Sequence, residues 1–83
     1  MKKRYVLVND DEYLFAKNLR ALRQKQKPYL SQNRLSKRLG VCRTTYIGYE
    51  MGVRQAPAFF VINAAKYFGV EADRMLREKL WKE

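Results

Sequence analysis

The glycines and prolines of this 83-residue chain divide it into segments that are each long enough for one short helix. Pro28 follows a first apolar pattern, and a helix ends before it because proline disfavours helical geometry in the preceding residue. Gly40, Gly52 and Gly69 each follow a later pattern, where a left-handed glycine commonly terminates a helix. Pro57 is suited to open another helix. The chain is therefore expected to form short helices joined by short loops.

Apolar residues recur within these segments at intervals of three and four, which places them on one face of a helix. Helices are predicted over about residues 10–26, 31–39, 43–50, 57–68 and 72–81. In the fourth of these, the buried stripe is expected to consist of Val61, Ile62, Ala65 and Phe68. The pattern predicts an all-α fold, a compact five-helix bundle in which residues 10–83 form a single domain.

The first nine residues have a different character from the rest. Residues 4–8 are β-branched and aromatic, which favours a short strand. A single strand has no partner within an otherwise helical chain. Residues 1–9 are therefore expected to form either an ordered arm or a strand that pairs with a second copy of the protein.

Positive charge dominates the middle of the chain. The net charge is +10, and between residues 13 and 70 the only acid is Glu50, among eleven basic residues. A lone acid in such a field is expected to be paired. A small basic domain usually has an anionic partner, nucleic acid first and a membrane surface second. No segment approaches the roughly 20 apolar residues of a membrane span, so no membrane partner is expected.

Several classes of function are excluded by the residues that the chain lacks. It has no histidine and one cysteine, Cys42, whereas zinc sites need about four such ligands and Cys–His catalysis needs a histidine base. No acid pair, metal-ligand set or activated nucleophile can be assembled. We therefore expect no enzyme, and no metal, cofactor or small-molecule substrate. A single thiol forms no internal disulfide, which suits a reducing cytosol.

Residues 30–52 carry the pattern that points to function, because two short helices are joined there by a turn containing Gly40. Ser36 places a small side chain where the second helix could cross closely. The inward-facing residues are predicted to be Leu35, Leu39, Val41, Tyr46 and Tyr49. The outer face of the second helix then carries Arg43, Thr44, Ile47, Gly48 and Met51. This is helix-turn-helix geometry, in which the second helix enters the major groove of DNA.

The same segment resembles the Cro/repressor-type, or Xre-like, helix-turn-helix domain of bacterial and phage transcription regulators. The resemblance rests on Leu30-Ser31-Gln32, Leu35, Leu39-Gly40-Val41, Arg43-Thr44-Thr45-Tyr46, Tyr49-Glu50 and Gly52, and continues in residues 65–70 and 73–76. It covers about residues 13–77 and implies a lambda-repressor-like bundle that binds a palindromic operator as a homodimer. It also implies a bacterial or phage origin and a place in the cytoplasm, at the nucleoid.

The resemblance assigns roles to individual residues. Arg43, Thr44 and Gly48 match positions that approach base edges, and Ile47 is placed to touch a thymine methyl. The residues that match phosphate contacts are Ser31 and Gln32 at the start of the second helix, and Arg54 after the third. The connection around Lys27 is about two residues longer than is usual in the family. The extra length would either bring Lys25 and Lys27 near the DNA backbone or have no effect on binding.

Two further sets of residues carry predictions about structure and assembly. Arg23 and Glu50 match a pair that ties the first helix to the third in some relatives, and we expect this ion pair to be partly buried. The residues considered for a dimer interface are Phe59, Phe60, Leu80 and Trp81. The alternative is that Phe59 and Phe60 complete an enlarged core, and that Leu80 and Trp81 cover its end.

The leading functional hypothesis is a sequence-specific regulator that binds double-stranded DNA and acts as a repressor. At 83 residues it is expected to have no effector domain, so that control comes from concentration, dimerisation or a partner chain. The alternative is an antitoxin-like adaptor that binds a protein partner and autoregulates through DNA. An RNA-binding role is less well supported, because the chain lacks the aromatic strands and clamp loop of common RNA-binding modules.

Overall fold

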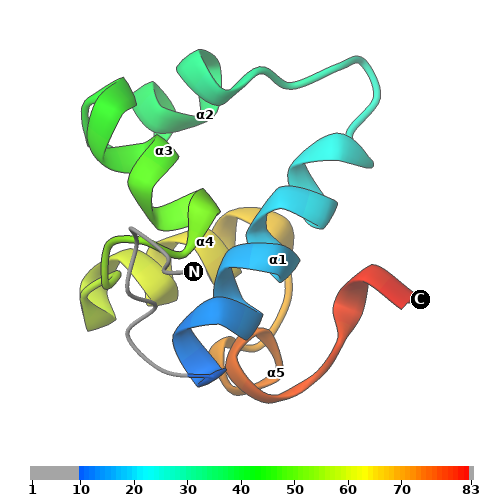
Figure 1. Ribbon diagram of the computed structural model, residues 1–83. Helices are drawn as coiled ribbons and strands as arrows, with labels where there is room; N and C mark the ends of the chain where they lie inside the picture. Colours follow the sequence, from blue (N-terminus) through cyan, green and yellow to red (C-terminus); the bar gives the residue numbers. More distant parts are fainter. Residues whose placement is uncertain (1–9, 83) are drawn as a thin grey trace, which may run out of the picture.

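The computed structural model describes residues 10–82, with side chains from residue 14 onward, and is shown in Figure 1. The helices are α1 (Asp10–Gln24), α2 (Gln32–Arg38), α3 (Arg43–Met51), α4 (Ala58–Phe68), α5 (Ala72–Arg77) and a final 3₁₀ turn, η1 (Leu80–Lys82). These residues contain no strand, and the predicted all-α, five-helix fold is confirmed. The arm or strand predicted for residues 1–9 lies outside the described residues.

The ends of the helices follow the predicted turn residues, with two differences in length. Gly52 and Gly69 cap α3 and α4 in the left-handed conformation, with φ of 77° and 70°. The first helix ends at Gln24, two residues earlier than expected. The single helix predicted over 72–81 is wrong: Glu78 is extended, with φ −110° and ψ 157°, and separates α5 from η1.

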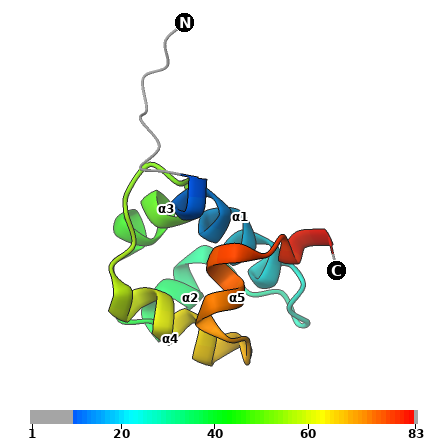
Figure 2. The same ribbon diagram turned by 90° about the horizontal axis from the view of Figure 1, so that it is seen from below.

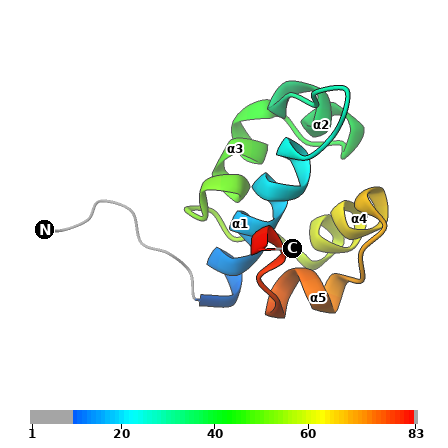
Figure 3. The ribbon, with the colours of Figure 1, turned by 90° about the vertical axis from the view of Figure 1, so that its right-hand side faces the viewer.

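Helix α1 lies at the centre of the molecule and contacts α3, α5 and η1. Figure 3 shows α3 and α4 on either side of α1, with the C-terminal end of the chain folded back over it. Figure 2 shows α1 and α3 side by side, and α4 next to α5. Helix α2 packs mainly against α3, which itself packs on α1, so α2 lies at the outer edge of the bundle, at the top of Figure 1.

The core is built around the aromatic ring of Phe60, which is fully buried. Its ring lies edge-on to Phe15, with centroids 6.1 Å apart, and to Tyr46 at 6.2 Å. The ring of Tyr49 is tilted against it at 4.6 Å. Aromatic pairs prefer such edge and tilted arrangements because their charge distributions are then complementary. One side chain of α4 thus joins α1 and α3.

The position of Phe60 corrects the predicted buried stripe of α4. The buried residues of this helix are Phe60, Val61, Ala64 and Ala65. Ile62, which was predicted to be buried, is 45% exposed. Burying the larger ring of Phe60 rotates the helix by one residue, which turns Ile62 outward. The assignment of Phe60 to a dimer interface is therefore wrong, whereas Phe59 is 58% exposed.

A buried asparagine of α1, which the sequence pattern did not single out, fixes the end of the chain. The Asn18 side-chain amide donates to the carbonyls of Met75, at 2.8 Å, and Glu78, at 2.7 Å. Its oxygen accepts a hydrogen bond from the Leu80 amide at 2.8 Å. Leu80 is 3% exposed and belongs to the core, so its assignment to a dimer interface is also wrong. Trp81 is half-buried, with the Lys17 ammonium 4.4 Å from its ring centre.

Candidate nucleic-acid interface

The α2–α3 unit has the crossing that a helix-turn-helix needs. Ser36 is 1% exposed, so its small side chain lets the two helices approach as predicted. The hydroxyl of Ser36 donates to the Asn33 carbonyl at 2.7 Å. The backbone amide of Val41 donates to the Ser36 carbonyl at 3.0 Å, which closes the turn between the helices. These local bonds fix the direction in which α3 leaves the turn.

The two helices start with caps of different strength. Ser31 accepts a hydrogen bond from the Arg34 amide at 3.1 Å, which confirms it as the N-cap of α2. Cys42 precedes α3 without a side-chain capping bond, as expected for a residue that replaces serine or threonine. Its exposed thiol lies 3.2 Å from the Thr45 hydroxyl. Contacts with the side chain and backbone of Thr45 lower the pKa of this thiol.

The predicted ion pair between Arg23 and Glu50 is confirmed. Arg23 Nε lies 2.9 Å from Glu50 Oε2, and Arg23 Nη2 lies 3.1 Å from Oε1, so the contact is bidentate. Both residues are buried, at 4% and 6% exposure. The pair connects α1 to the end of α3. It therefore sets the angle at which α3 is presented on the surface.

Additional groups surround this pair and satisfy its remaining hydrogen-bonding capacity. Tyr46 donates its hydroxyl to Glu50 Oε2, and Gln32 donates its amide to Glu50 Oε1 at 2.8 Å. Arg23 also donates to the Leu30 carbonyl at 3.1 Å. Gln32 was predicted to hold DNA phosphate, but the structure engages one donor of its amide within this network. The signal for the network in the sequence was the single acid in a basic segment.

The protonation equilibria of the network reflect both burial and pairing. Burial alone would raise the pKa of Glu50, but hydrogen bonds from Arg23, Tyr46 and Gln32 and the positive charge of Arg23 outweigh it and lower that pKa. Burial likewise disfavours the charged guanidinium, yet the bonds and charge of Glu50 raise the pKa of Arg23. Burial and the bond to Glu50 raise the pKa of Tyr46. The charged pair with a neutral phenol is therefore the stable state.

The outer side of α3 carries the side chains that were predicted to read bases. Arg43 and Thr44 are exposed at the start of the helix, and Ile47 is half-buried one turn later. Met51 is 50% exposed at the end of the helix. Gly48 does not fit this group, because the structure buries it. The assignment of Gly48 to the residues that approach base edges is therefore corrected.

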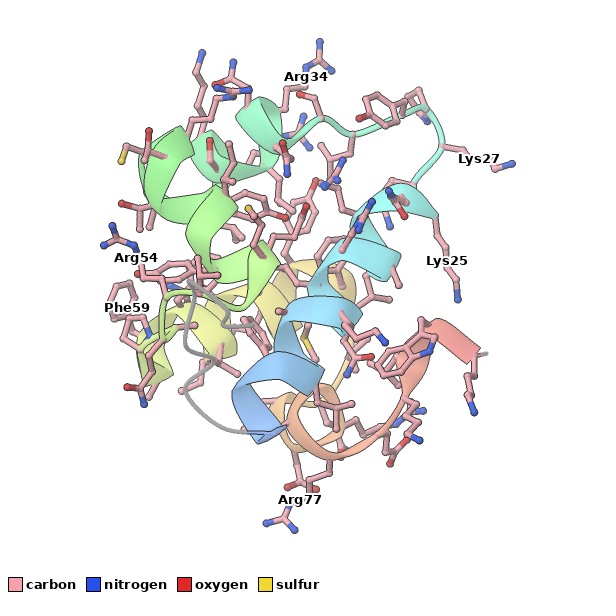
Figure 4. The ribbon with its side chains drawn as sticks, viewed as in Figure 1. Lys25, Lys27, Arg34, Arg54, Phe59 and Arg77 are labelled. Carbon is pink, nitrogen blue, oxygen red and sulfur yellow. The ribbon has the colours of Figure 1, made fainter. Side chains whose placement is uncertain are left out.

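Gly48 is buried because the chain after α3 folds back over it. The backbone amides of Val53 and Arg54 both donate to the Gly48 carbonyl, at 3.2 and 3.3 Å. A Cβ atom at position 48 would lie 3.1 Å from Cβ, 3.2 Å from Nε and 3.3 Å from Cδ of Arg54. The aliphatic stem of Arg54 thus covers the glycine. Figure 4 shows the Arg54 guanidinium extending outward beside α3.

Exposed basic side chains surround the helix-turn-helix. Figure 4 shows Lys27 in the loop before α2, on the opposite side of the molecule from Arg54, and Arg34 on the outside of α2. Lys37 and Arg38 are also exposed, in the last turn of α2. The Arg38 guanidinium donates to the Tyr67 hydroxyl at 2.7 Å. The three basic residues of α2 were not predicted as site residues, although their closeness in a segment without acids indicated a basic surface.

At the opposite end of the molecule, around α5, basic side chains are paired with acids. There Arg74 pairs with Glu78 at 2.8 Å, and Arg77 pairs with Asp73 at 2.7 Å. Figure 4 shows Arg77 at the far end of the bundle from Arg34. The acids of the described chain, apart from those at the start of α1 and Glu50, therefore gather around α5. Unbalanced positive charge is left around α2 and α3.

The described part of the chain lacks the features of two other kinds of site. Among the side chains that the structure describes, from residue 14 to residue 82, no three acidic or cysteine side chains lie together as a group that could bind a metal ion. Within the same part of the chain, none of the helices has the length and apolar character needed to cross a bilayer.

Known proteins are similar to this chain in sequence or in fold. A helix-turn-helix family model matches residues 19–75, which is more than half of the chain. The chain is 31% identical over 64 residues to the uncharacterised HTH-type transcriptional regulator YqaE of Bacillus subtilis (strain 168). The matched stretch is 77% of this chain and 53% of YqaE, so the chain spans about half the length of that relative.

A solved structure supports the same assignment at the level of the fold. It is the solution structure of the SOS-response transcriptional repressor LexA from Eubacterium rectale, with a TM-score of 0.77 and 20% identity. The match covers 89% of this chain and 77% of the LexA chain. Together with the family model and the observed α2–α3 geometry, these findings show that the chain belongs to the Cro/repressor-type, or Xre-like, helix-turn-helix family of DNA-binding transcriptional regulators.

Proposed function

We propose that this protein recognises a specific double-stranded DNA sequence with α3 and acts as a repressor. The observation that carries the proposal is the placement of Arg43 and Thr44. They are exposed at the start of α3, a helix whose inner face packs on α1 and which is flanked by exposed basic residues. A helix of this kind fits the major groove with its N-terminal side chains toward the bases. A repressor of this type acts by occupying its operator.

The contacts divide into two groups by their chemistry. Arg43 carries a planar guanidinium that can donate two hydrogen bonds to guanine, and Thr44 and Ile47 offer methyl groups to thymine. Lys27 and Ser31 lie before or at the start of α2, where they are placed to contact phosphate. Gln32 keeps one amide hydrogen beyond its bond to Glu50, which is available to a phosphate oxygen.

A palindromic operator requires a two-fold dimer, and α4 supplies a suitable surface. Phe59 and Ile62 are 58% and 45% exposed and lie one turn apart on this helix. Beside them is a hollow of about 470 Å³, lined by Gln55, Ala56, Pro57, Ala58, Val61, Ile62, Ala72 and Leu76. Large exposed apolar side chains next to an apolar hollow are typical of a surface that contacts protein. We propose that two copies associate here.

Selection of bound sequences from a random double-stranded DNA library tests the proposal. The expected result is a palindromic sequence with two half-sites. Arg43→Ala should then lose about 1–3 kcal/mol of discrimination at one base step of each half-site, because a bidentate contact is removed. If Arg43→Ala binds the selected sequence and random DNA in the same ratio as the wild-type protein, base reading by Arg43 is wrong.

The exposed apolar surface of α4 also favours a second candidate function. An antitoxin-like adaptor would use Phe59 and Ile62 to hold a partner protein and would bind DNA to regulate its own synthesis. Light scattering after size-exclusion chromatography separates the two cases. A concentration-dependent dimer that Phe59→Ser weakens supports the homodimer. A monomer at all concentrations that copurifies with one partner in equal amounts supports the adaptor.

A further inference from the structure

We propose that Arg54 reads bases from outside α3, supplying the side chain that the helix lacks at Gly48. This assigns Arg54 to sequence specificity, in place of the phosphate contact that the family resemblance implies. The inference rests on the proposed DNA-binding function of α3. It concerns which residues of this particular chain contribute to the reading surface.

The exposed side of α3 is the first observation. Helical spacing places positions 44, 47, 48 and 51 on one side, and of these only Gly48 is buried. The neighbouring side chains Thr44, Ile47 and Met51 carry no charge. The middle of this surface thus has a gap where a side chain of α3 would otherwise project. The stem of Arg54 lies in that gap.

The second observation is how firmly Arg54 is held there. Its own amide and that of Val53 both bond to the Gly48 carbonyl, which fixes the Arg54 backbone beside the middle of α3. The Arg54 atoms Cβ, Cδ and Nε all lie within 3.3 Å of the place where a Cβ of residue 48 would be. The stem follows the helix surface from Cβ to Nε. Its guanidinium therefore starts from a restricted set of positions, which favours a directional contact.

The third observation is that the Arg54 guanidinium keeps its hydrogen-bond donors available. Among the described side chains, those of residues 14–82, none forms a hydrogen bond or ion pair with the Arg54 guanidinium. A guanidinium without such partners, whose Nε lies beside the middle of α3, has two parallel donors that can bind guanine O6 and N7. A phosphate contact would instead be expected at the edge of the helix-turn-helix, where Lys27 and Arg34 lie.

The test compares Arg54→Ala with Arg34→Ala, a matched loss of one exposed arginine from α2. Binding to the selected operator, to operators changed at each base step and to random DNA is measured at one salt concentration. Arg54→Ala should lose on the order of 5- to 150-fold of discrimination at one base step. Arg34→Ala should weaken binding to all of these DNAs by a similar factor. Arg54→Lys should restore affinity for random DNA more fully than it restores the preference.

A second variant tests the role of the glycine without removing charge. Gly48→Ala places a methyl group 3.1–3.3 Å from the Arg54 stem, which must shift away from α3. We expect Gly48→Ala to weaken the preference at the same base step as Arg54→Ala, with affinity for random DNA unchanged. The double variant should lose no more preference than Arg54→Ala alone. Thermal unfolding monitored by circular dichroism checks that each variant is folded.

Two results would overturn the proposal in different ways. If Arg54→Ala weakens binding to every sequence equally while Arg43→Ala alters a base preference, Arg54 contacts phosphate and only this inference fails. If the wild-type protein selects no sequence at all, the proposed function fails and this inference fails with it.

Discussion

The carboxylate of Glu50 receives hydrogen bonds from three side chains on three helices. Because so many bonds meet at one residue, the stability of the protein should be sensitive to replacement of Glu50. Arg23 comes from α1, Gln32 from α2 and Tyr46 from α3. Removing one member of a buried ion pair costs about 3–5 kcal/mol, because the other charge is left without compensation. We predict that Glu50→Gln is destabilised by this amount and melts about 10 °C or more below wild type.

A control for this prediction is Glu78→Gln, which removes an exposed ion pair with Arg74. Because water screens and solvates exposed charges, that variant should lose no more than about 1 kcal/mol. Urea unfolding at pH 7 measures the free energy of unfolding of both variants, and thermal unfolding measures their melting temperatures. A Glu50→Gln protein that melts within a degree or two of wild type would show that the pair contributes little to stability.

The lowered pKa of Glu50 also makes a prediction about acid. A carboxyl group whose pKa is lower in the folded than in the unfolded protein stabilises the fold above the unfolded value, close to 4.5. Between the unfolded and folded pKa values the unfolded chain binds more protons. The free energy of unfolding should therefore fall as pH drops below about 4.5, until Glu50 is protonated in the folded state.

Urea unfolding at pH values from 7 to 3 tests this pH dependence. The wild-type protein should lose stability more steeply below pH 4.5 than Glu50→Gln, which has no carboxyl group at this position. Parallel curves for the two proteins would mean that other acids account for the sensitivity to pH.

At the scale of the element, α4 offers a comparison between adjacent phenylalanines. Phe60 is fully buried among three aromatic rings, whereas Phe59 is 58% exposed. Deleting a buried aromatic side chain leaves a cavity and typically costs about 3–5 kcal/mol. We predict this loss for Phe60→Ala and a change within about 0.5 kcal/mol for Phe59→Ala, as is usual for surface substitutions. Equal losses in urea unfolding would contradict the observed orientation of the helix.

The same helix shows what periodicity alone can predict. Its existence and both of its ends follow from Pro57 and Gly69, and the spacing identifies Val61 and Ala65 as buried. Periodicity does not decide between Phe60 and Ile62 as the remaining buried residue, because both choices give a continuous apolar stripe. That choice depends on the space between Phe15 and Tyr46, which belong to other helices. Tertiary packing therefore fixes the rotation of the helix.

The C-terminal segment and the candidate site also show that contacts between elements cannot be predicted from periodicity or from a family match. The sequence pattern continued as a helix to residue 81, but the bonds from Asn18 hold an extended Glu78 instead. Likewise, matching Gly48 to a reading position of the family gave its place along α3. It did not reveal that a residue six positions later covers it. By contrast, Arg23–Glu50 was predictable because a lone acid in a basic segment has few alternatives to pairing.

At the scale of the whole molecule, the charges are divided between two ends. The acids Asp73 and Glu78 neutralise Arg77 and Arg74 around α5, and the surface around α2 and α3 keeps its positive charge. Such a separation orients the molecule as it approaches a polyanion, with the helix-turn-helix leading. Affinity that comes from this charge is independent of sequence. Specificity must come from the few side chains over α3.

The dependence of DNA binding on salt concentration should differ between variants at the α2–α3 end and variants at the α5 end of the molecule. Each phosphate contact releases counterions, so the logarithm of the binding constant falls with the logarithm of salt concentration by about 0.9 per contact. We predict that Arg34→Ala reduces this slope by about one contact and that Arg77→Ala leaves it unchanged. Both variants remove one exposed arginine and alter the net charge equally. Titrations of random duplex DNA at several salt concentrations measure the slopes. An equal change in both would mean that net charge, and not its placement, governs DNA binding.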